Sequence, residues 1–258
     1  MNWATAYGAS RKAAPKKIPE TDAIFERLKQ VNAQADADDR VLRLSLDAKA
    51  SVRIGDYSRG GQTRVIVKAA DHDFQAQVKL TPFGIFLPQH DRLYLYFTTS
   101  KLTSDFMVDC LLDGCNQLQL DFPHITSLLV NLDNGPENHS RRTQFMFRMT
   151  QLADHFQWTI DLAYYPPYHS KYNPIERVWG VLEKHWNGSL LDSCQTVIRF
   201  AQSFTFRQQH PLVQWLKTVY HTGVHLTAQQ MRTLETRFQR CPLLPKWFVR
   251  IVPFPAPD

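Results

Sequence analysis

The chain has 258 residues, of which 43% are hydrophobic and 21% charged, and these fractions exclude a disordered or collagen-like protein. Lys and Arg outnumber Asp and Glu by 30 to 24, so the net charge is +6. That surplus is compatible with a polyanionic partner such as DNA and equally with a generic basic surface. Four scattered cysteines, and apolar runs well short of the roughly 20 residues that span a bilayer, predict a soluble, reduced, cytoplasmic protein without a membrane partner.

The first part of the chain predicts a connector followed by strands. Residues 1–38 combine a basic Ala-, Lys- and Pro-rich stretch with a short helical segment at 21–35. Apolar and polar side chains then alternate with the period of two that is typical of strands, in four segments: 41–47, 51–56, 63–69 and 92–98. Three such segments in close succession indicate an antiparallel meander.

Beyond residue 100 the pattern changes to alternating helices and strands. Apolar residues at helical spacing predict helices over 102–120 and 141–158. Short apolar runs predict strands over 125–133 and 159–166, and a Pro-rich loop leads to a helix over 173–186. This order indicates an α/β fold with a mixed sheet flanked by helices.

The remaining residues predict a helical C-terminal extension. Helical spacing continues over 192–204, 211–222 and 227–240, and 246–252 has the pattern of a terminal strand. The chain is therefore divided into three parts: a connector with a short helix (1–38), an α/β core (39–188) and the extension (189–258).

Three acidic residues stand where strands end and a helix begins. Asp47 ends the first strand, Asp133 ends the apolar strand 125–133, and Glu176 lies at the start of the helix after the Pro-rich loop. Strand ends meet at one edge of an open α/β sheet, where ligands bind. Converging carboxylates repel one another unless cations lie between them, and such oxygen ligands select Mg²⁺ or Mn²⁺. The pattern predicts a two-ion site suited to attack on a phosphodiester.

Each carboxylate also has an ordinary structural explanation. Asp47 could solvate a turn, and Asp133 precedes the turn-forming pair Asn134-Gly135. Glu176 could close a capping box with Asn173. Three other acidic residues compete for the same roles: Asp56 for the first, and Glu137 and Glu183 for the third.

Three segments resemble the acidic motifs of the DDE transposases. They are LRLSLDAKASVRIGDYSRGG, LVNLDNGPENHSRRTQF and YYPPYHSKYNPIERVWGVLE, and together they cover most of residues 40–190. The resemblance is to insertion-sequence enzymes of the ISAzo type, related to the mariner-like group, whose catalytic domain resembles ribonuclease H. It implies an RNase H-like fold and the triad Asp47, Asp133 and Glu176. The Pro-rich loop before NPIERVW is the most specific of the motifs.

The resemblance also implies an activity and its partners. Two Mg²⁺ or Mn²⁺ ions would assist hydrolysis at a transposon end and the attack of the released 3′-hydroxyl on target DNA, in a nucleoid-associated protein. Family members usually carry N-terminal helix-turn-helix modules, so the sequence predicts an N-terminally shortened enzyme. Three matters stay open: homodimer formation, a purely hydrolytic RNase H-like nuclease or resolvase, and a catalytically silent fragment that binds DNA or inhibits a full-length transposase.

Basic residues around these motifs are candidates for DNA contacts. Arg and Lys supply affinity through phosphates without reading sequence, although each one alone is more often a solvated surface charge. The candidates lie in the turn after the second strand, after Asp133, in the Pro-rich loop and on the following helix: Arg59, Arg141, Arg142, His169, Lys171, Arg177 and Lys184.

Overall fold

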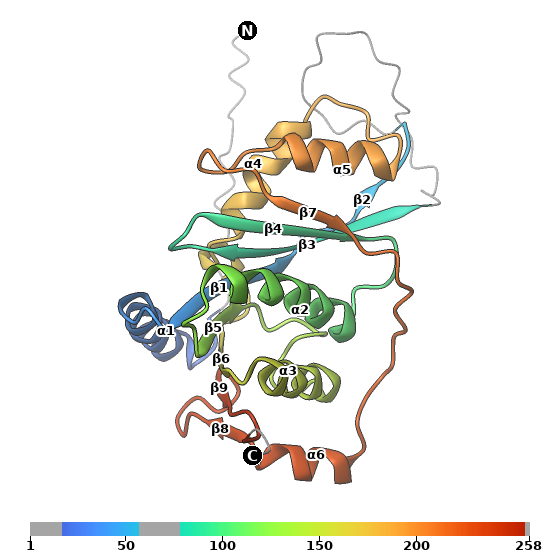
Figure 1. The fold of residues 1–258 in the computed structure, drawn as a ribbon. Coiled ribbons are helices and arrows are strands. Elements are labelled where there is room, and N and C mark those ends of the chain that lie inside the picture. Colours follow the sequence, from blue (N-terminus) through green and yellow to red (C-terminus); the bar gives the residue numbers. More distant parts are fainter. Residues whose placement is uncertain (1–16, 57–77, 256–258) are drawn as a thin grey trace, which may run out of the picture.

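The computed structural model describes residues 17–56 and 78–255 (Figure 1). Its helices are α1 (Thr21–Ala37), α2 (Ser104–Asp121), α3 (Thr143–Phe156), α4 (Glu176–Trp186), α5 (Cys194–Ser203) and α6 (Ala228–Glu235), with a 3₁₀ turn at Ser170–Tyr172. Its strands are β1 (Val41–Ala48), β2 (Val52–Arg53), β3 (Lys79–Leu87), β4 (Arg92–Thr98), β5 (Ser127–Leu132), β6 (Thr159–Tyr164), β7 (Leu212–Trp215), β8 (Phe238–Arg240) and β9 (Phe248–Ile251). None of the helices within these ranges is long and apolar enough to cross a membrane.

The strands of the described residues form one mixed sheet in the order β7-β4-β3-β1-β5-β6-β9-β8, with β2 paired to β3. β1 lies between β3, which runs antiparallel to it, and β5, which runs parallel to it. β5 and β6 are also parallel, so β1, β5 and β6 end at the same edge of the sheet. The expected mixed sheet flanked by helices is confirmed.

Alternate side chains of β1 face two different environments on opposite sides of the sheet. Leu42, Leu44 and Leu46 are buried in an apolar cluster that also includes the inward faces of α2 and α3. Arg43, between them, forms an ion pair with Asp36 of α1 at 2.6 Å. The next two outward-facing residues of β1, Ser45 and Asp47, form hydrogen bonds with residues at the start of α4 and within it. A second apolar cluster packs α4 and α5 against β3 and β4 (Figure 1).

The helix expected at 21–35 is α1, and it belongs to the main apolar cluster through Ile24 and Leu28. β3 was not expected, because it contains Pro82 and Gly84, residues that argue against a central strand. The strand expected over 51–56 is reduced to β2, and the one expected over 63–69 lies outside the described residues.

The prediction of a helix over 211–222 was wrong. Leu212–Trp215 forms β7, which pairs in parallel with β4, and the residues after it follow an irregular path. The segment is rich in β-branched and aromatic side chains, which suit an edge strand as well as a helix face. The helix expected over 227–240 is also shorter, because it ends as α6 and the chain continues into β8.

Candidate active site

The three predicted carboxylates come from three elements that meet at one edge of the sheet. Asp47 is the penultimate residue of β1, and Asp133 follows the last residue of β5. These strands are parallel neighbours, with Ser45 opposite Asn131, so both chains leave the sheet side by side. Glu176 is the first residue of α4.

A hydrogen-bonded contact fixes the start of α4 on β1. The side chain of Asn173 is buried and donates to the carbonyl of Leu46 at 2.7 Å, while Ser45 Oγ donates to Asn173 Oδ1. Ser45 Oγ in turn accepts from the backbone N–H of Ile175 at 3.0 Å. The suggested capping box of Asn173 and Glu176 is therefore absent, because Asn173 is engaged with β1 instead. Glu176 is thereby held next to the strand that carries Asp47.

Gly84 allows α4 to lie this close to the sheet. It is the cross-strand neighbour of Asp47 in β3. A β-carbon at position 84 would lie 2.5 Å from Ile175 Cδ1 and 2.8 Å from the ring of Trp179. An isolated glycine inside a strand is a signal for such an approach, although the sequence does not say which element makes it.

The pKa of Asp47 is strongly perturbed by its surroundings. Burial raises its pKa from 3.8 to about 7, and repulsion by Asp133 and Glu176 acts in the same direction. The hydrogen bond from Trp179 Nε1, at 2.7 Å, opposes this shift. The charges of Asp133 and Glu176 therefore lie near enough to Asp47 to disfavour its ionised form.

Asp133 is oriented by the loop that follows it. Asn138 donates from Nδ2 to Asp133 Oδ1 at 2.8 Å, and the carbonyl of Asn138 accepts from the buried hydroxyl of Tyr164 at 2.8 Å. Burial raises the pKa of Tyr164 well above its usual range, so its hydroxyl remains a donor. A β-carbon at Gly135 would lie 3.1–3.3 Å from Asn138 Oδ1 and from both carboxylate oxygens of Asp133. The loop thus gathers several oxygens around one point.

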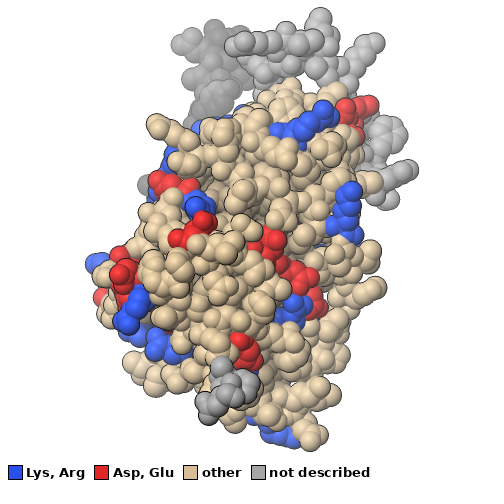
Figure 2. Space-filling view, viewed as in Figure 1, with Lys and Arg blue, Asp and Glu red and all other residues tan. Residues whose placement is uncertain are grey.

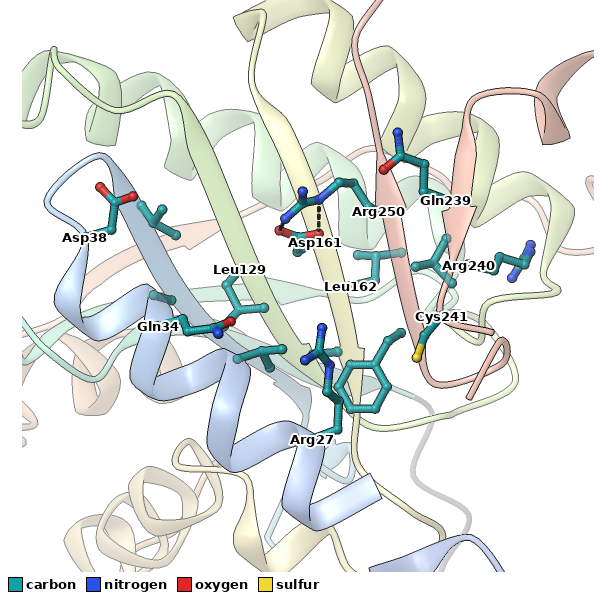
Figure 3. A pocket seen from close by; sticks show the side chains of 16 residues that line it. Arg27, Gln34, Asp38, Leu129, Asp161, Leu162, Gln239, Arg240, Cys241 and Arg250 are labelled. Carbon is teal, nitrogen blue, oxygen red and sulfur yellow. Dashed lines mark hydrogen bonds and ion pairs between the residues drawn. The ribbon is translucent and has the colours of Figure 1, made fainter. Parts of the chain in front are cut away.

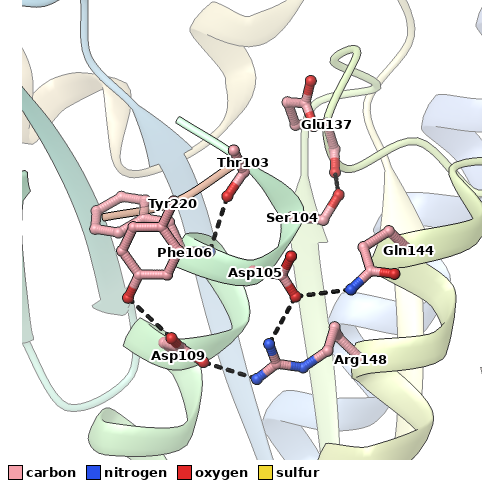
Figure 4. Close-up of polar contacts among 9 residues, drawn as sticks. All are labelled: Thr103, Ser104, Asp105, Phe106, Asp109, Glu137, Gln144, Arg148 and Tyr220. Carbon is pink, nitrogen blue, oxygen red and sulfur yellow. Dashed lines mark hydrogen bonds and ion pairs between the residues drawn. The ribbon is translucent and has the colours of Figure 1, made fainter. Parts of the chain in front are cut away.

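The same loop is braced from the other side by α2 (Figure 4). Ser104 Oγ donates to the carbonyl of Glu137 at 2.7 Å. Arg148 of α3 bridges Asp105 and Asp109 of α2, with both distances at 2.7 Å. The position of the Asp133 loop therefore depends on α2 and α3 as well as on the sheet.

The three other acidic residues that were candidates for the same roles either form ion pairs or are exposed. Glu137 forms an ion pair with Arg142 at 3.1 Å, and Glu183 forms one with Lys49 at 2.7 Å. Asp56 is exposed in a bend after β2, and it is not among the charges that shift the pKa of Asp47. These contacts favour the original three residues.

The donor set suits Mg²⁺ or Mn²⁺, because every candidate ligand atom is an oxygen. The side-chain Oδ1 atoms of Asn134 and Asn138 are buried without a hydrogen-bond partner, next to Asp133 in the chain. Across residues 17–56 and 78–255, however, no three His, Cys, Asp or Glu side chains lie close enough together to hold a metal ion as they stand.

The predicted DNA contacts fall into different surroundings. Four of the side chains are exposed: Arg141, Lys171, Arg177 and Lys184. Arg142 is partly buried by its pair with Glu137. His169 is buried, its Nδ1 lies 2.7 Å from the carbonyl of Pro167, and its ring contacts Phe25, all of which favour a structural role. Arg59 lies outside the described residues.

A cavity of about 400 Å³ lies between α1 and strands β6 and β9 (Figure 3). Its wall carries the ion pair of Arg250 with Asp161, at 2.8 Å, and a patch of apolar side chains. None of the three candidate carboxylates lines it. The three candidate carboxylates therefore lie at the sheet edge and not in this cavity.

The sheet order, in which β1 lies between an antiparallel β3 and a parallel β5, defines an RNase H-like fold. The sequence profile of the Rhodopirellula transposase DDE domain matches residues 6–253, so the chain belongs to this transposase family. No curated protein matches it in sequence.

Solved structures of the Mos1 transposase share the fold. The paired-end complex with the left transposon end has a TM-score of 0.51 at 11% identity, over 79% of this chain and 59% of that chain. The Mos1 mariner paired-end complex with Mn also has a TM-score of 0.51 at 11% identity, over 76% and 58%. A pre-cleavage Mos1 transpososome has 0.50 at 10%, over 79% and 59%. The chain thus spans about three fifths of the length of these proteins.

Proposed function

We propose that the chain is the catalytic part of a DNA transposase that cuts at transposon ends and joins them to target DNA. The observation that carries this proposal is the position of Asp47, Asp133 and Glu176, where the parallel strands β1 and β5 end beside the start of α4. Membership of the DDE family and the transposase–DNA complexes among its structural relatives support it. The DNA partner and the division into connector, catalytic core and extension are part of the same proposal.

Asp47, Asp133 and Glu176 would hold two Mg²⁺ or Mn²⁺ ions, which when bound lower the pKa of the nucleophile and stabilise charge on the phosphate. In the first step water forms a bond to phosphorus and loses a proton, the bond from phosphorus to the 3′-oxygen breaks, and the departing oxygen takes up a proton to become the 3′-hydroxyl. In the second step the released 3′-hydroxyl forms the new bond and a target 3′-oxygen leaves. Trp179 and Asn138 would keep Asp47 and Asp133 in fixed orientations throughout.

Five of the basic residues would contact phosphates around this site: Arg141, Arg142, Lys171, Arg177 and Lys184. Arg177 and Lys184 are exposed on α4 and follow Glu176 along the same helix. Contacts of this kind position DNA without reading its sequence.

The test is strand cleavage by Asp133→Asn on DNA that carries the transposon ends, with Asp56→Asn as the matched control. Loss of Mg²⁺- or Mn²⁺-dependent cleavage in the first variant and its retention in the second is the expected result, because only Asp133 would hold an ion. Cleavage that survives in Asp133→Asn overturns the proposal. Cleavage without joined products would instead identify a hydrolytic nuclease.

A further inference from the structure

A second feature of the catalytic edge is a groove of about 920 Å³, separate from the carboxylates. It lies where β1 and β4 leave the sheet and β3 enters it, and residues 219–222 form its far wall. We call it the lysine groove, after three of its lining residues: Lys49, Lys79 and Lys101. Lys49 comes two residues after Asp47, so the groove begins beside the candidate active site.

The charge of the lysine groove has one sign. None of the described residues that line it is acidic. Lys49 is paired with Glu183, but neither Lys79 nor Lys101 has an ion-pair partner within the described ranges. Both of these side chains are exposed. Two unneutralised ammonium groups in a groove attract a polyanion.

Figure 2 shows how charged side chains are distributed on one face of the molecule. Most of that face is uncharged, and small groups of Lys and Arg side chains are interspersed with groups of Asp and Glu.

Hydrogen bonds hold the walls of the groove in place. Ser51 Oγ and Thr81 Oγ1 lie 2.8 Å apart and join the exit of β1 to the start of β3. The backbone N–H of Tyr220 donates to Ser100 Oγ at 2.7 Å, and the hydroxyl of Tyr220 donates to Asp109 at 2.8 Å (Figure 4). The groove is thus formed before any ligand binds, and its hydroxyl groups are of the type that contacts phosphate oxygens.

Two sides of the groove are continuous along the chain with elements of the candidate active site. One side continues through Ala48 to Asp47 in β1. The other continues from Lys101 to Ser104, which donates to the carbonyl of Glu137 in the Asp133 loop. A DNA strand that lay in the groove would therefore pass next to the segment that carries Asp47 and the segment that leads to Ser104.

We propose that the lysine groove binds the phosphate backbone of duplex DNA beside the bond to be cut, through Lys79 and Lys101. This inference rests on the proposed function, because it assigns a path to the DNA that the carboxylates would cleave. It adds contacts on the β1–β3–β4 side of the site, whereas the residues predicted from sequence that fall in the described ranges lie in the loops before α3 and α4 and on α4.

The experiment measures binding of the full chain to a fluorescein-labelled DNA duplex of arbitrary sequence, with a chelator present, as a function of salt. In Lys79→Ala/Lys101→Ala, affinity should fall about tenfold or more, and the slope of log K against log salt should decrease by about 0.9 for each phosphate that the variant no longer neutralises. The matched control is Lys29→Ala/Arg232→Ala, which removes the same charge from exposed positions on α1 and α6. Lys79→Arg/Lys101→Arg should retain the wild-type slope.

Three results would overturn the inference. The first is that the groove variant has the same salt slope as the control variant. The second is that the control variant loses as much affinity for DNA as the groove variant does. The third is that the wild-type chain binds no DNA. Cleavage by wild type and by Asp133→Asn is measured in parallel. Metal-dependent cleavage by wild type, together with unchanged binding by the groove variant, would reject the groove and leave the proposed function standing.

Discussion

The indole Nε1 of Trp179 donates a hydrogen bond of 2.7 Å to Oδ2 of Asp47. Trp179 is almost fully buried, and it packs against Gly84 across the strand from Asp47. One side chain thus does two things: it attaches α4 to the sheet and it stabilises the ionised form of the carboxylate. The packing of the helix and the electrostatics of the site are consequently coupled.

Replacing Trp179 with Phe keeps most of the apolar packing and removes the donor. The pKa of Asp47 should then rise further above about 7, because the hydrogen bond that lowers it is gone. Mn²⁺ should bind more weakly at neutral pH, since the proton must leave before the ion binds. Calorimetric titration with Mn²⁺ checks this expectation. Trp186→Phe is the control, because its indole donates to Glu183 on the same helix, and unchanged Mn²⁺ affinity in Trp179→Phe would contradict the coupling.

Gly84→Ala should destabilise the protein by about 1–3 kcal/mol or more, the range for overpacking a filled core. The new methyl group would meet Ile175 and Trp179 at distances that force α4 away from β3. Gly180→Ala on the outer side of α4 meets no atom within 4 Å, so it should stabilise the helix by up to about 1 kcal/mol. Urea unfolding of both variants measures the difference, and equal effects of the same sign would show that α4 is not held against Gly84.

The stability of the metal-free chain should depend on pH through Asp47. The unfolded chain loses this proton near pH 3.8 and the folded chain near pH 7, so the folded state holds more protons between these values. The free energy of unfolding should therefore fall as the pH rises through this window, by at most about 4 kcal/mol. Above pH 7 the decrease is complete.

Asp47→Asn should remove that decrease, because the amide does not ionise. Urea unfolding with a chelator at about pH 4 and about pH 8 gives the comparison, and a chain that kept the wild-type pH dependence would show that another group causes it. Asp56→Asn is the matched control, since Asp56 is exposed and does not act on Asp47. It should leave the wild-type profile unchanged.

Asn138→Ala should weaken Mn²⁺ binding by about 10- to 100-fold, the usual effect of removing a group that orients a ligand. The carboxylate of Asp133 would lose the donor at 2.8 Å that fixes it. Asn131→Ala is the control on the preceding strand, because that buried amide donates to Asn32 of α1. Calorimetry and thermal unfolding together separate the two roles, since both variants should lose stability but only Asn138→Ala should lose Mn²⁺ affinity.

Sequence alone predicted most of the secondary structure and the three carboxylates. The period-two alternation of β1 and the helical spacing of α2, α3 and α4 are local patterns, and each appears where it was expected. The family resemblance, which family membership confirms, selected Asp47 over Asp56. That selection stays a prediction until the variants are measured.

Tertiary structure decided what lies around those carboxylates. β3 was not predicted from the sequence, because Pro82 and Gly84 are unusual in a central strand. In the structure, the absence of a side chain at Gly84 allows Trp179 to pack against the strand. Asn173 has the sequence context of a helix cap, yet it bonds to β1, at a separation of 127 residues from Leu46. Residues 211–222 fit a helix by spacing, but part of the segment became β7 because β4 offered an open edge. Local patterns are set by neighbouring residues, whereas the environment that tunes Asp47 comes from partners distant in sequence, which only the folded chain brings together.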